Sequence, residues 1–196
     1  MTKAPLNIPE EKLKHYLRLI EKQKALTTAE RARGDFMQYV HCIWQEFIKG
    51  EHHKIMAKKF NDLATGKIKR LIVNMPPRHT KSEFASYLLP SWLMGRNPKL
   101  KIIQATHTGE LAVRFGRKVR NLMASGEYNQ VFPEVKLRSD SLAAGRWETN
   151  DGGEYFAAGV GGAITGRGAD LMIIDDPHSE QDAMSPSALE NAYEWY

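Results

Sequence analysis

Two groups of residues have the types and spacing needed to bind a nucleoside triphosphate. The first is the segment Met75–Ser82, which reads MPPRHTKS. A P-loop has the pattern GxxxxGK[ST], in which backbone N–H groups surround the phosphates, the lysine reaches the β and γ oxygens, and the hydroxyl binds Mg²⁺. Here Met75 and Thr80 occupy the two glycine positions, so only Lys81 and Ser82 match the pattern.

The place of this segment in the chain favours phosphate binding. It follows a run of apolar, branched residues over 70–75 that predicts a buried strand, and it precedes a predicted helix over 81–93. A helix N-terminus attracts anions through its free N–H groups and its dipole. The residues expected to contact the nucleotide are those of the loop and the first helical turn: Pro77, Arg78, His79, Thr80, Lys81 and Ser82. The alternative is a proline-stiffened turn with a solvated lysine.

The second group is a pair of carboxylates after the apolar run Leu171–Ile174. Ligands of α/β proteins bind at the carboxyl ends of the strands. We expect Asp175, with Ser82, to bind Mg²⁺, and Asp176 to polarise the attacking water, as phosphoryl transfer requires. The alternative is a strand end followed by a helix cap. Together with Lys81, the two carboxylates form the minimum set for binding Mg-ATP.

A third candidate is Arg167, in the glycine-rich segment Gly161–Gly168 just before the carboxylate strand. An arginine at this point can stabilise transition-state charge, either in its own subunit or across a subunit interface, and Arg78 is a second candidate for that role. The alternative is a loop in which the glycines only permit tight turns.

Composition limits the class of protein. The chain has 196 residues, a formal charge of +5 and one cysteine, which excludes an internal disulfide. It has no signal-peptide pattern and no apolar run near the ~20 residues that span a bilayer, so we expect no membrane partner. The positive charge favours nucleic acid as a partner, although many basic proteins do not bind it.

Strand and helix patterns alternate through the last two thirds of the chain, which predicts an α/β fold with a mainly parallel central sheet flanked by helices. We divide the chain into an N-terminal helical segment, 1–66, and a core, 67–196. The expected helices of the first segment cover 9–26, 35–50 and 52–65. The core elements expected besides those above are a strand at 101–106, a helix capped by Thr108, a hairpin over 146–158, and a helix from 187 onward.

With these residues in place, the chain resembles the large terminase subunits of tailed bacteriophages, which are ATP-driven DNA-packaging motors. The resemblance covers about residues 35 to 196 and depends on the segments Gly66–Glu83, Ala105–Phe115 and Thr165–Pro177. It implies an N-terminal ATPase domain with a P-loop NTPase fold, followed by a ribonuclease-H-like nuclease domain. The chain ends within a predicted helix at Tyr196, so we expect a fragment that lacks the nuclease domain and neither cuts nor packages DNA alone.

By position, the resemblance makes Lys81 and Ser82 the phosphate and magnesium residues, Arg78 the loop arginine, and Asp175 the magnesium carboxylate. Asp176 stands where many relatives have glutamate, which is one methylene longer. The implied cofactors are ATP and Mg²⁺. The implied partners are double-stranded DNA, the small terminase subunit and the portal protein of the procapsid. The implied assembly is a homo-oligomeric ring, with the fragment alone a monomer, in the cytoplasm of the infected bacterial host.

Two other interpretations remain open. A helicase-like P-loop translocase would share the site but would need a second strand–helix lobe downstream. A basic DNA-binding module with an inert P-loop would explain the missing glycines, and it predicts DNA binding that is independent of nucleotide.

Overall fold

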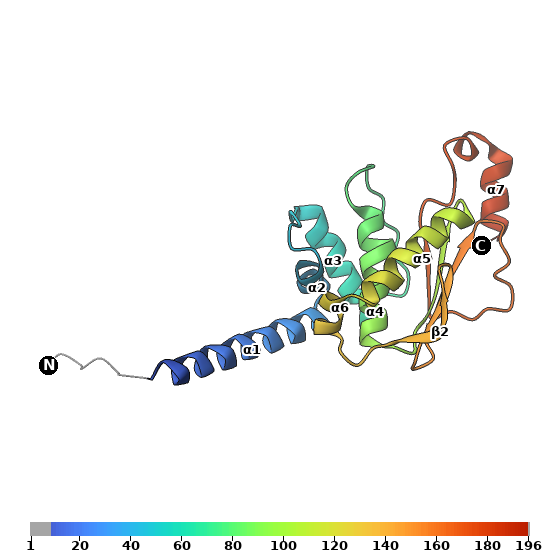
Figure 1. The fold of residues 1–196 in the computed structure, drawn as a ribbon. Coiled ribbons are helices and arrows are strands. Elements are labelled where there is room, and N and C mark those ends of the chain that lie inside the picture. The colour runs from blue at the N-terminus through green and yellow to red at the C-terminus, as the bar shows by residue number, and fades with distance from the viewer. Residues whose placement is uncertain (1–8, 196) are drawn as a thin grey trace.

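The computed structural model describes residues 9–195, which form an α/β fold with a five-stranded mixed sheet and seven α-helices (Figure 1). Three helices precede the sheet: α1 (Glu10–Gly34), α2 (Phe36–Ile43) and α3 (Glu51–Ala64). Asp35 begins α2 as predicted, because its side chain accepts a hydrogen bond from the Gln38 N–H. The helix expected to continue to Gly50 ends at Ile43 instead.

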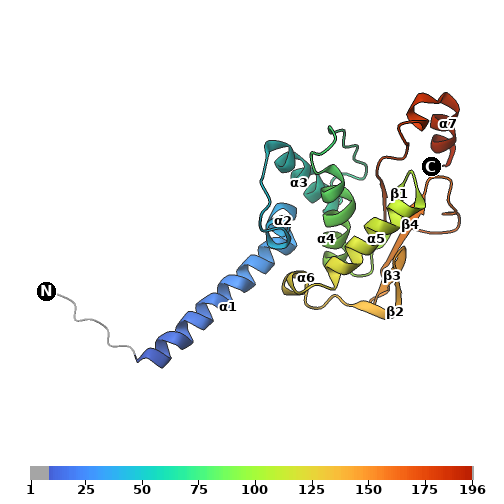
Figure 2. The ribbon, with the colours of Figure 1, turned by 45° about the horizontal axis from the view of Figure 1, so that its top comes forward.

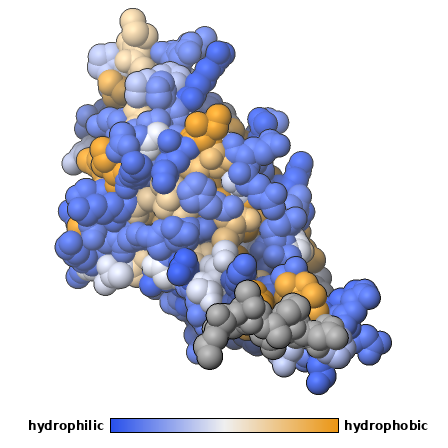
Figure 3. Space-filling view, turned by 90° about the vertical axis from the view of Figure 1, so that its left-hand side faces the viewer, coloured by the Kyte–Doolittle hydropathy of each residue, from blue (hydrophilic) through white to orange (hydrophobic). Residues whose placement is uncertain are grey.

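Helix α1 projects from the body of the molecule, and only Ala29 and Ala32 of its 25 residues are buried (Figures 1 and 2). The apolar side chains of its first half are about half exposed. On the side of the molecule from which α1 projects, the surface is largely hydrophilic, with small separate apolar areas (Figure 3). No helix in the described residues is long and apolar enough to cross a membrane.

The prediction of a buried strand over residues 70–75 is wrong. The segment is extended, but it pairs with no strand in the described part of the chain, and Ile72 is 85% exposed. Leu71, Val73 and Met75 still pack against the core, as expected for an extended chain with one face inward. An apolar run becomes a sheet strand only where a neighbouring backbone completes its hydrogen bonds.

The loop of residues 75–80 is named the phosphate loop for the role expected of it, and the helix after it begins at Lys81, as expected. It continues as a π-helical stretch, η1 (Glu83–Leu88), into α4 (Leu89–Arg96). The N–H of Leu89 donates to the carbonyl of Phe84, five residues back, and Pro90 has no N–H to donate. Proline inside the helix is therefore accommodated by a wider turn.

The sheet contains β1 (Lys101–Thr106), β2 (Leu137–Ala143), β3 (Arg146–Thr149), β4 (Glu154–Gly159) and β5 (Leu171–Ile174), in the order β2-β3-β4-β1-β5. Strand β1 is parallel to both β4 and β5, while β3 is antiparallel to β2 and β4. The predicted hairpin and strands at 101–106 and 171–174 are confirmed. The expectation of a mainly parallel sheet is corrected to a mixed one, because the β2-β3-β4 meander adds two antiparallel pairings.

The other helices are α5 (Gly109–Met123), α6 (Gly126–Val131) and α7 (Pro186–Trp195), with a short 3-10 turn, η2 (Asp182–Met184). Thr108 caps α5 as predicted by accepting a hydrogen bond from the Leu111 N–H. In Figure 2, α4 and α5 lie between the N-terminal helices and the sheet. Buried residues of α2 and α3 belong to the same apolar cluster as those of α4, α5 and the strands, which joins both segments in one core.

Candidate functional site

The phosphate loop and the carboxylate strand meet at one edge of the sheet. The ammonium group of Lys81 makes a short ion-paired hydrogen bond to Asp176 Oδ1 and lies 3.6 Å from Asp175 Oδ1. Lys81 is more than 90 positions from the two aspartates in the sequence. The fold thus brings together the lysine and both carboxylates that the sequence singles out.

Strand pairing fixes the position of the carboxylates. The Asp175 N–H donates to the Ala105 carbonyl at 2.9 Å, which extends the β1–β5 ladder by one residue. The His107 N–H then donates to the Asp176 carbonyl at 3.2 Å. Both aspartates therefore lie at the carboxyl ends of two adjacent parallel strands, where ligands of α/β sheets bind.

Asp175 is almost fully buried, with 6% exposure. The hydroxyl of Ser86, which is on η1, donates to Asp175 Oδ2 at 2.8 Å, and the side-chain amide of Gln104 on β1 donates to the Ser86 hydroxyl at 3.2 Å. A buried carboxylate is stable only when charges or hydrogen bonds compensate it. Ser86 provides this compensation at Oδ2, and Lys81 provides it at Oδ1.

Lys81 stays protonated in this setting. Partial burial lowers its pKa, but the hydrogen bond and charge of Asp176, with the charge of Asp175, outweigh burial and raise the pKa above its usual value. A second ion pair, at 2.9 Å between Lys118 on α5 and Glu83, ties the first turn after the loop to α5. Lys81 is therefore a cation held at the edge of the sheet by Asp175 and Asp176.

The backbone is strained at the same place. In the described residues, the non-glycine residues with positive φ are Arg78 (62°), Thr80 (61°) and Asp176 (45°). Such conformations cost roughly 1–3 kcal/mol each and concentrate at ligand sites. Thr80 occupies the second glycine position of the P-loop pattern, so the chain adopts there the left-handed conformation that glycine favours.

Sequence reasoning missed His53, on α3. The residue is 5% exposed, and its Nε2 lies 2.6 Å from the Thr80 hydroxyl oxygen. Burial, followed by the charges of His52 and His79, lowers the pKa of His53, so the neutral ring is favoured. No local pattern marks this contact, because the two residues are 27 positions apart and belong to different elements.

The remaining candidates differ in placement. Pro77, Arg78 and His79 are exposed at the tip of the loop, where His79 Nδ1 is 2.9 Å from the Pro77 carbonyl oxygen. Ser82, in the first turn of the helix, directly precedes η1 and makes no side-chain capping bond, so its hydroxyl is not committed to the backbone there.

Arg167 is not brought to Lys81. Its guanidinium pairs with Glu154 at 3.1 Å and stacks 3.9 Å above the ring of Phe156. Glu154 is paired with Lys101, the first residue of β1, at the opposite end of the sheet from Asp175. Within the chain, Arg167 therefore belongs to a different surface from the phosphate loop.

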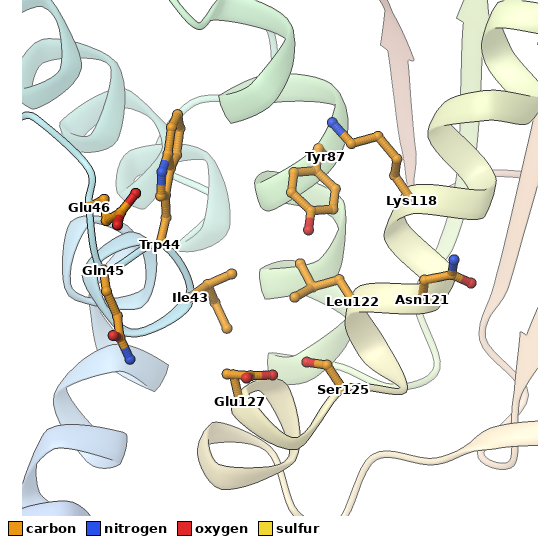
Figure 4. Close-up of a pocket in the computed structure, with 10 residues that line it drawn as sticks. All are labelled: Ile43, Trp44, Gln45, Glu46, Tyr87, Lys118, Asn121, Leu122, Ser125 and Glu127. Carbon is orange, nitrogen blue, oxygen red and sulfur yellow. The ribbon is translucent and has the colours of Figure 1, made fainter.

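A cavity of about 670 Å³ lies between the end of α2, η1, α5 and α6. Trp44 and Tyr87 line opposite sides of it, and Lys118 bends over Tyr87 with its ammonium 4.6 Å from the ring centroid (Figure 4). Tyr87 is six residues beyond Lys81, on the same continuous helix. The cavity thus lies beside the site but includes none of its charged residues.

A Mg²⁺ site made with one or two carboxylates, a hydroxyl, phosphates and water fits these residues. No group of three or more His, Cys, Asp or Glu side chains with metal-binding geometry occurs in residues 9–195. An ion coordinated entirely by such side chains is therefore not what this part of the chain provides. Comparisons with models of known protein families and with curated proteins gave no match.

Proposed function

We propose that the chain is a P-loop NTPase domain that binds and hydrolyses Mg-ATP. The observation that carries the proposal is the contact of Lys81 with Asp175 and Asp176 at the carboxyl edge of parallel strands. A cation at a helix start, beside a buried carboxylate and a more exposed one, supplies the charges that phosphoryl transfer needs.

The Thr80 backbone supports the same proposal against the inert-module alternative. Loss of glycine from a phosphate loop would argue against function if the loop had changed its conformation. Here φ of Thr80 is 61°, so the non-glycine residue adopts the glycine-type conformation despite its cost. Maintaining a strained loop beside Lys81 is consistent with a functional role for that loop.

Each residue has a distinct part in the proposed reaction. Ser82 and Asp175 would hold Mg²⁺, which when bound neutralises phosphate charge. Lys81 exchanges its contact with Asp176 for the β and γ oxygens of the nucleotide. Asp176, whose side chain is 64% exposed, is thereby freed to orient the attacking water and accept its proton. Arg78, at the exposed tip of the loop, meets the charge that develops on the γ-phosphate.

We further propose that this ATPase is the motor domain of a phage DNA-packaging terminase, acting on double-stranded DNA in the cytoplasm of an infected bacterium. The support is the sequence resemblance over about 35–196, in particular the runs Met75–Ser82 and Thr165–Pro177. In that assembly the domain would work in a homo-oligomeric ring with the portal protein and the small terminase subunit, and Arg167 would act on a neighbouring subunit's site.

The test is phosphate release from ATP by the wild-type chain and by Asp176→Asn, with and without Mg²⁺ and double-stranded DNA. The expected result is Mg²⁺-dependent release that DNA changes and that Asp176→Asn reduces by about 100-fold or more, the lower end of the range for a positioned acid–base group, while Mg-ATP still binds. Equal turnover by the two chains would overturn the role of Asp176. DNA binding with no nucleotide binding at all would favour the inert module.

A further inference from the structure

His53 links helix α3 to the phosphate loop through a chain of hydrogen bonds. The ring is buried and packs against Phe47 and Phe84, with centroid distances of 4.7 and 5.0 Å. Phe84 lies on η1, in the helix that starts at Lys81. Aromatic packing on Phe47 and Phe84 thus restricts the orientation of the imidazole independently of the hydrogen bonds to its nitrogens.

The hydrogen bonds define the tautomer of His53. The backbone N–H of Gly50 donates to Nδ1 at 2.9 Å, so Nδ1 is the unprotonated nitrogen. In the neutral ring the proton is then on Nε2, which donates to the Thr80 hydroxyl oxygen at 2.6 Å. That hydroxyl in turn donates to the carbonyl of His79 at 2.6 Å. Each donor in this series of hydrogen bonds has an acceptor, and each donates in the direction from α3 toward the loop.

We propose that His53 is a positioning residue of the phosphate loop, which acts through the Thr80 hydroxyl to hold Thr80 in its left-handed conformation. A β-branched residue is disfavoured at positive φ, so another interaction must select this conformation. The bond from His53 does so from an element outside the loop. With Thr80 fixed, the N–H groups at the start of the helix keep a constant direction toward the position proposed for the phosphates. This role rests on the proposed function, because the loop that His53 positions is the one proposed to bind the phosphates.

The competing explanation is that His53 only stabilises the start of α3 through the bond from Gly50. The two roles use different ring nitrogens and can be separated by substitution. In His53→Asn the amide oxygen replaces the acceptor Nδ1, but the side chain is too short to reach Thr80. In His53→Gln the amide N–H₂ is at about the distance of Nε2 and can donate to Thr80, while the acceptor for Gly50 is lost. His52→Asn is the comparison variant: the centroid of the His52 ring lies 3.8 Å from that of His53 and 5.7 Å from that of His79, so it removes ring contacts with both while the hydrogen-bond series stays intact.

The first measurement is amide hydrogen exchange over residues 78–82 and 50–54, on the full chain without nucleotide. We expect His53→Asn to accelerate exchange in 78–82 and to leave 50–54 near wild type, and His53→Gln to do the reverse. Thr80→Val, which keeps the shape and removes the hydroxyl, should reproduce the loop effect of His53→Asn. Exchange over 78–82 that is faster in His53→Gln than in His53→Asn, or unchanged in both His53→Asn and Thr80→Val, would overturn the proposal.

The second measurement is Mg-ATP affinity of the same variants by calorimetry. Loss of one neutral hydrogen bond predicts a decrease on the order of 2- to 13-fold for His53→Asn, with His53→Gln and His52→Asn closer to wild type. Failure of the wild type to bind nucleotide while His53→Asn still loosens the loop would refute the proposed function and leave the positioning role intact. Tight binding by the wild type, with no effect of His53→Asn on exchange or affinity, would refute the positioning role alone.

Discussion

Replacement of Ser86 by alanine should reveal how strongly the site depends on its buried support. The Ser86 side chain is fully buried and donates to Asp175 Oδ2 at 2.8 Å while accepting from the Gln104 amide at 3.2 Å. The substitution removes the hydroxyl but adds no bulk. It leaves a buried carboxylate with one fewer donor and a buried amide N–H without its acceptor.

The expected loss follows from these contacts. A hydrogen bond to a charged group contributes about 1.5–3 kcal/mol. For a chain of this size, 1 kcal/mol corresponds to about 2–4 °C in Tm, so Ser86→Ala should lower Tm by about 3–12 °C. Because Ser86 also orients the proposed magnesium carboxylate, Mg²⁺-dependent ATP affinity should fall about 10- to 100-fold, as for other residues that orient metal ligands.

The assay is urea unfolding for the free energy and calorimetry for Mg-ATP affinity, with Ser91→Ala as the matched control. Ser91 is fully buried on the same helix and bonds to Tyr39 and the Leu88 carbonyl, which are neutral groups away from Lys81. The Ser91→Ala variant should therefore be less stable than wild type but bind Mg-ATP with the same affinity. The reasoning is refuted if the free energy of unfolding of Ser86→Ala is within about 0.5 kcal/mol of the wild-type value, which is the range of ordinary surface substitutions. It is also refuted if both variants lose Mg-ATP affinity equally.

Three further outcomes are expected. Burial and the neighbouring His52 and His79 lower the pKa of His53, so below a pH of about 6.5 the unfolded chain binds more protons than the folded one, and the free energy of unfolding decreases as the pH is lowered. His53→Gln should weaken this pH dependence in a series of urea-unfolding measurements, and an unchanged slope would contradict the assignment. Gly116→Ala should cost about 1–3 kcal/mol in unfolding free energy, because its Cβ would be 2.6 Å from the Ala144 carbonyl oxygen, whereas Gly126, with no atom within 4 Å of the added Cβ, should tolerate alanine. Arg167→Ala should cost about 1 kcal/mol of unfolding free energy through the lost contacts with Phe156 and Glu154; a loss above 3 kcal/mol would mean that these two contacts do not account for its role.

The elements that sequence reasoning predicted correctly are those with a local signal. Asp35 and Thr108 supply side-chain acceptors at helix starts, and both caps are formed. The turn after Asn150 and the alternation around it specify the β3–β4 hairpin. Strand β5 is a short apolar run that finds a partner in β1.

The errors arise where a distant partner decides the structure. Residues 70–75 have the composition of a strand, but no strand of the described chain pairs with them, so they remain extended and partly exposed. Strand β2 was missed because its sequence, LRSDSLA, is polar and its residues are half or fully exposed. At the site, strand order places Asp175 and Asp176 beside the end of β1, but the strand expected before Lys81 does not form. The contact of Lys81 with Asp175 depends instead on the packing of its own helix, in which Ser86 bonds to Asp175. The bond from His53 to Thr80 likewise depends on how α3 packs, which no motif encodes.

Mg-ATP binding to wild type, Lys81→Ala and Lys118→Ala tests the central claim most directly. Lys118 is a suitable control because it also forms an ion pair with a nearby acid, Glu83, but does not contact Asp175 or Asp176. Removal of the phosphate lysine should weaken calorimetric affinity by about 10- to 100-fold, equivalent to about 1.5–3 kcal/mol, while Lys118→Ala binds like wild type and thermal unfolding shows that both variants are folded. Equal affinity of all three chains would contradict the claim that Lys81 binds the phosphates.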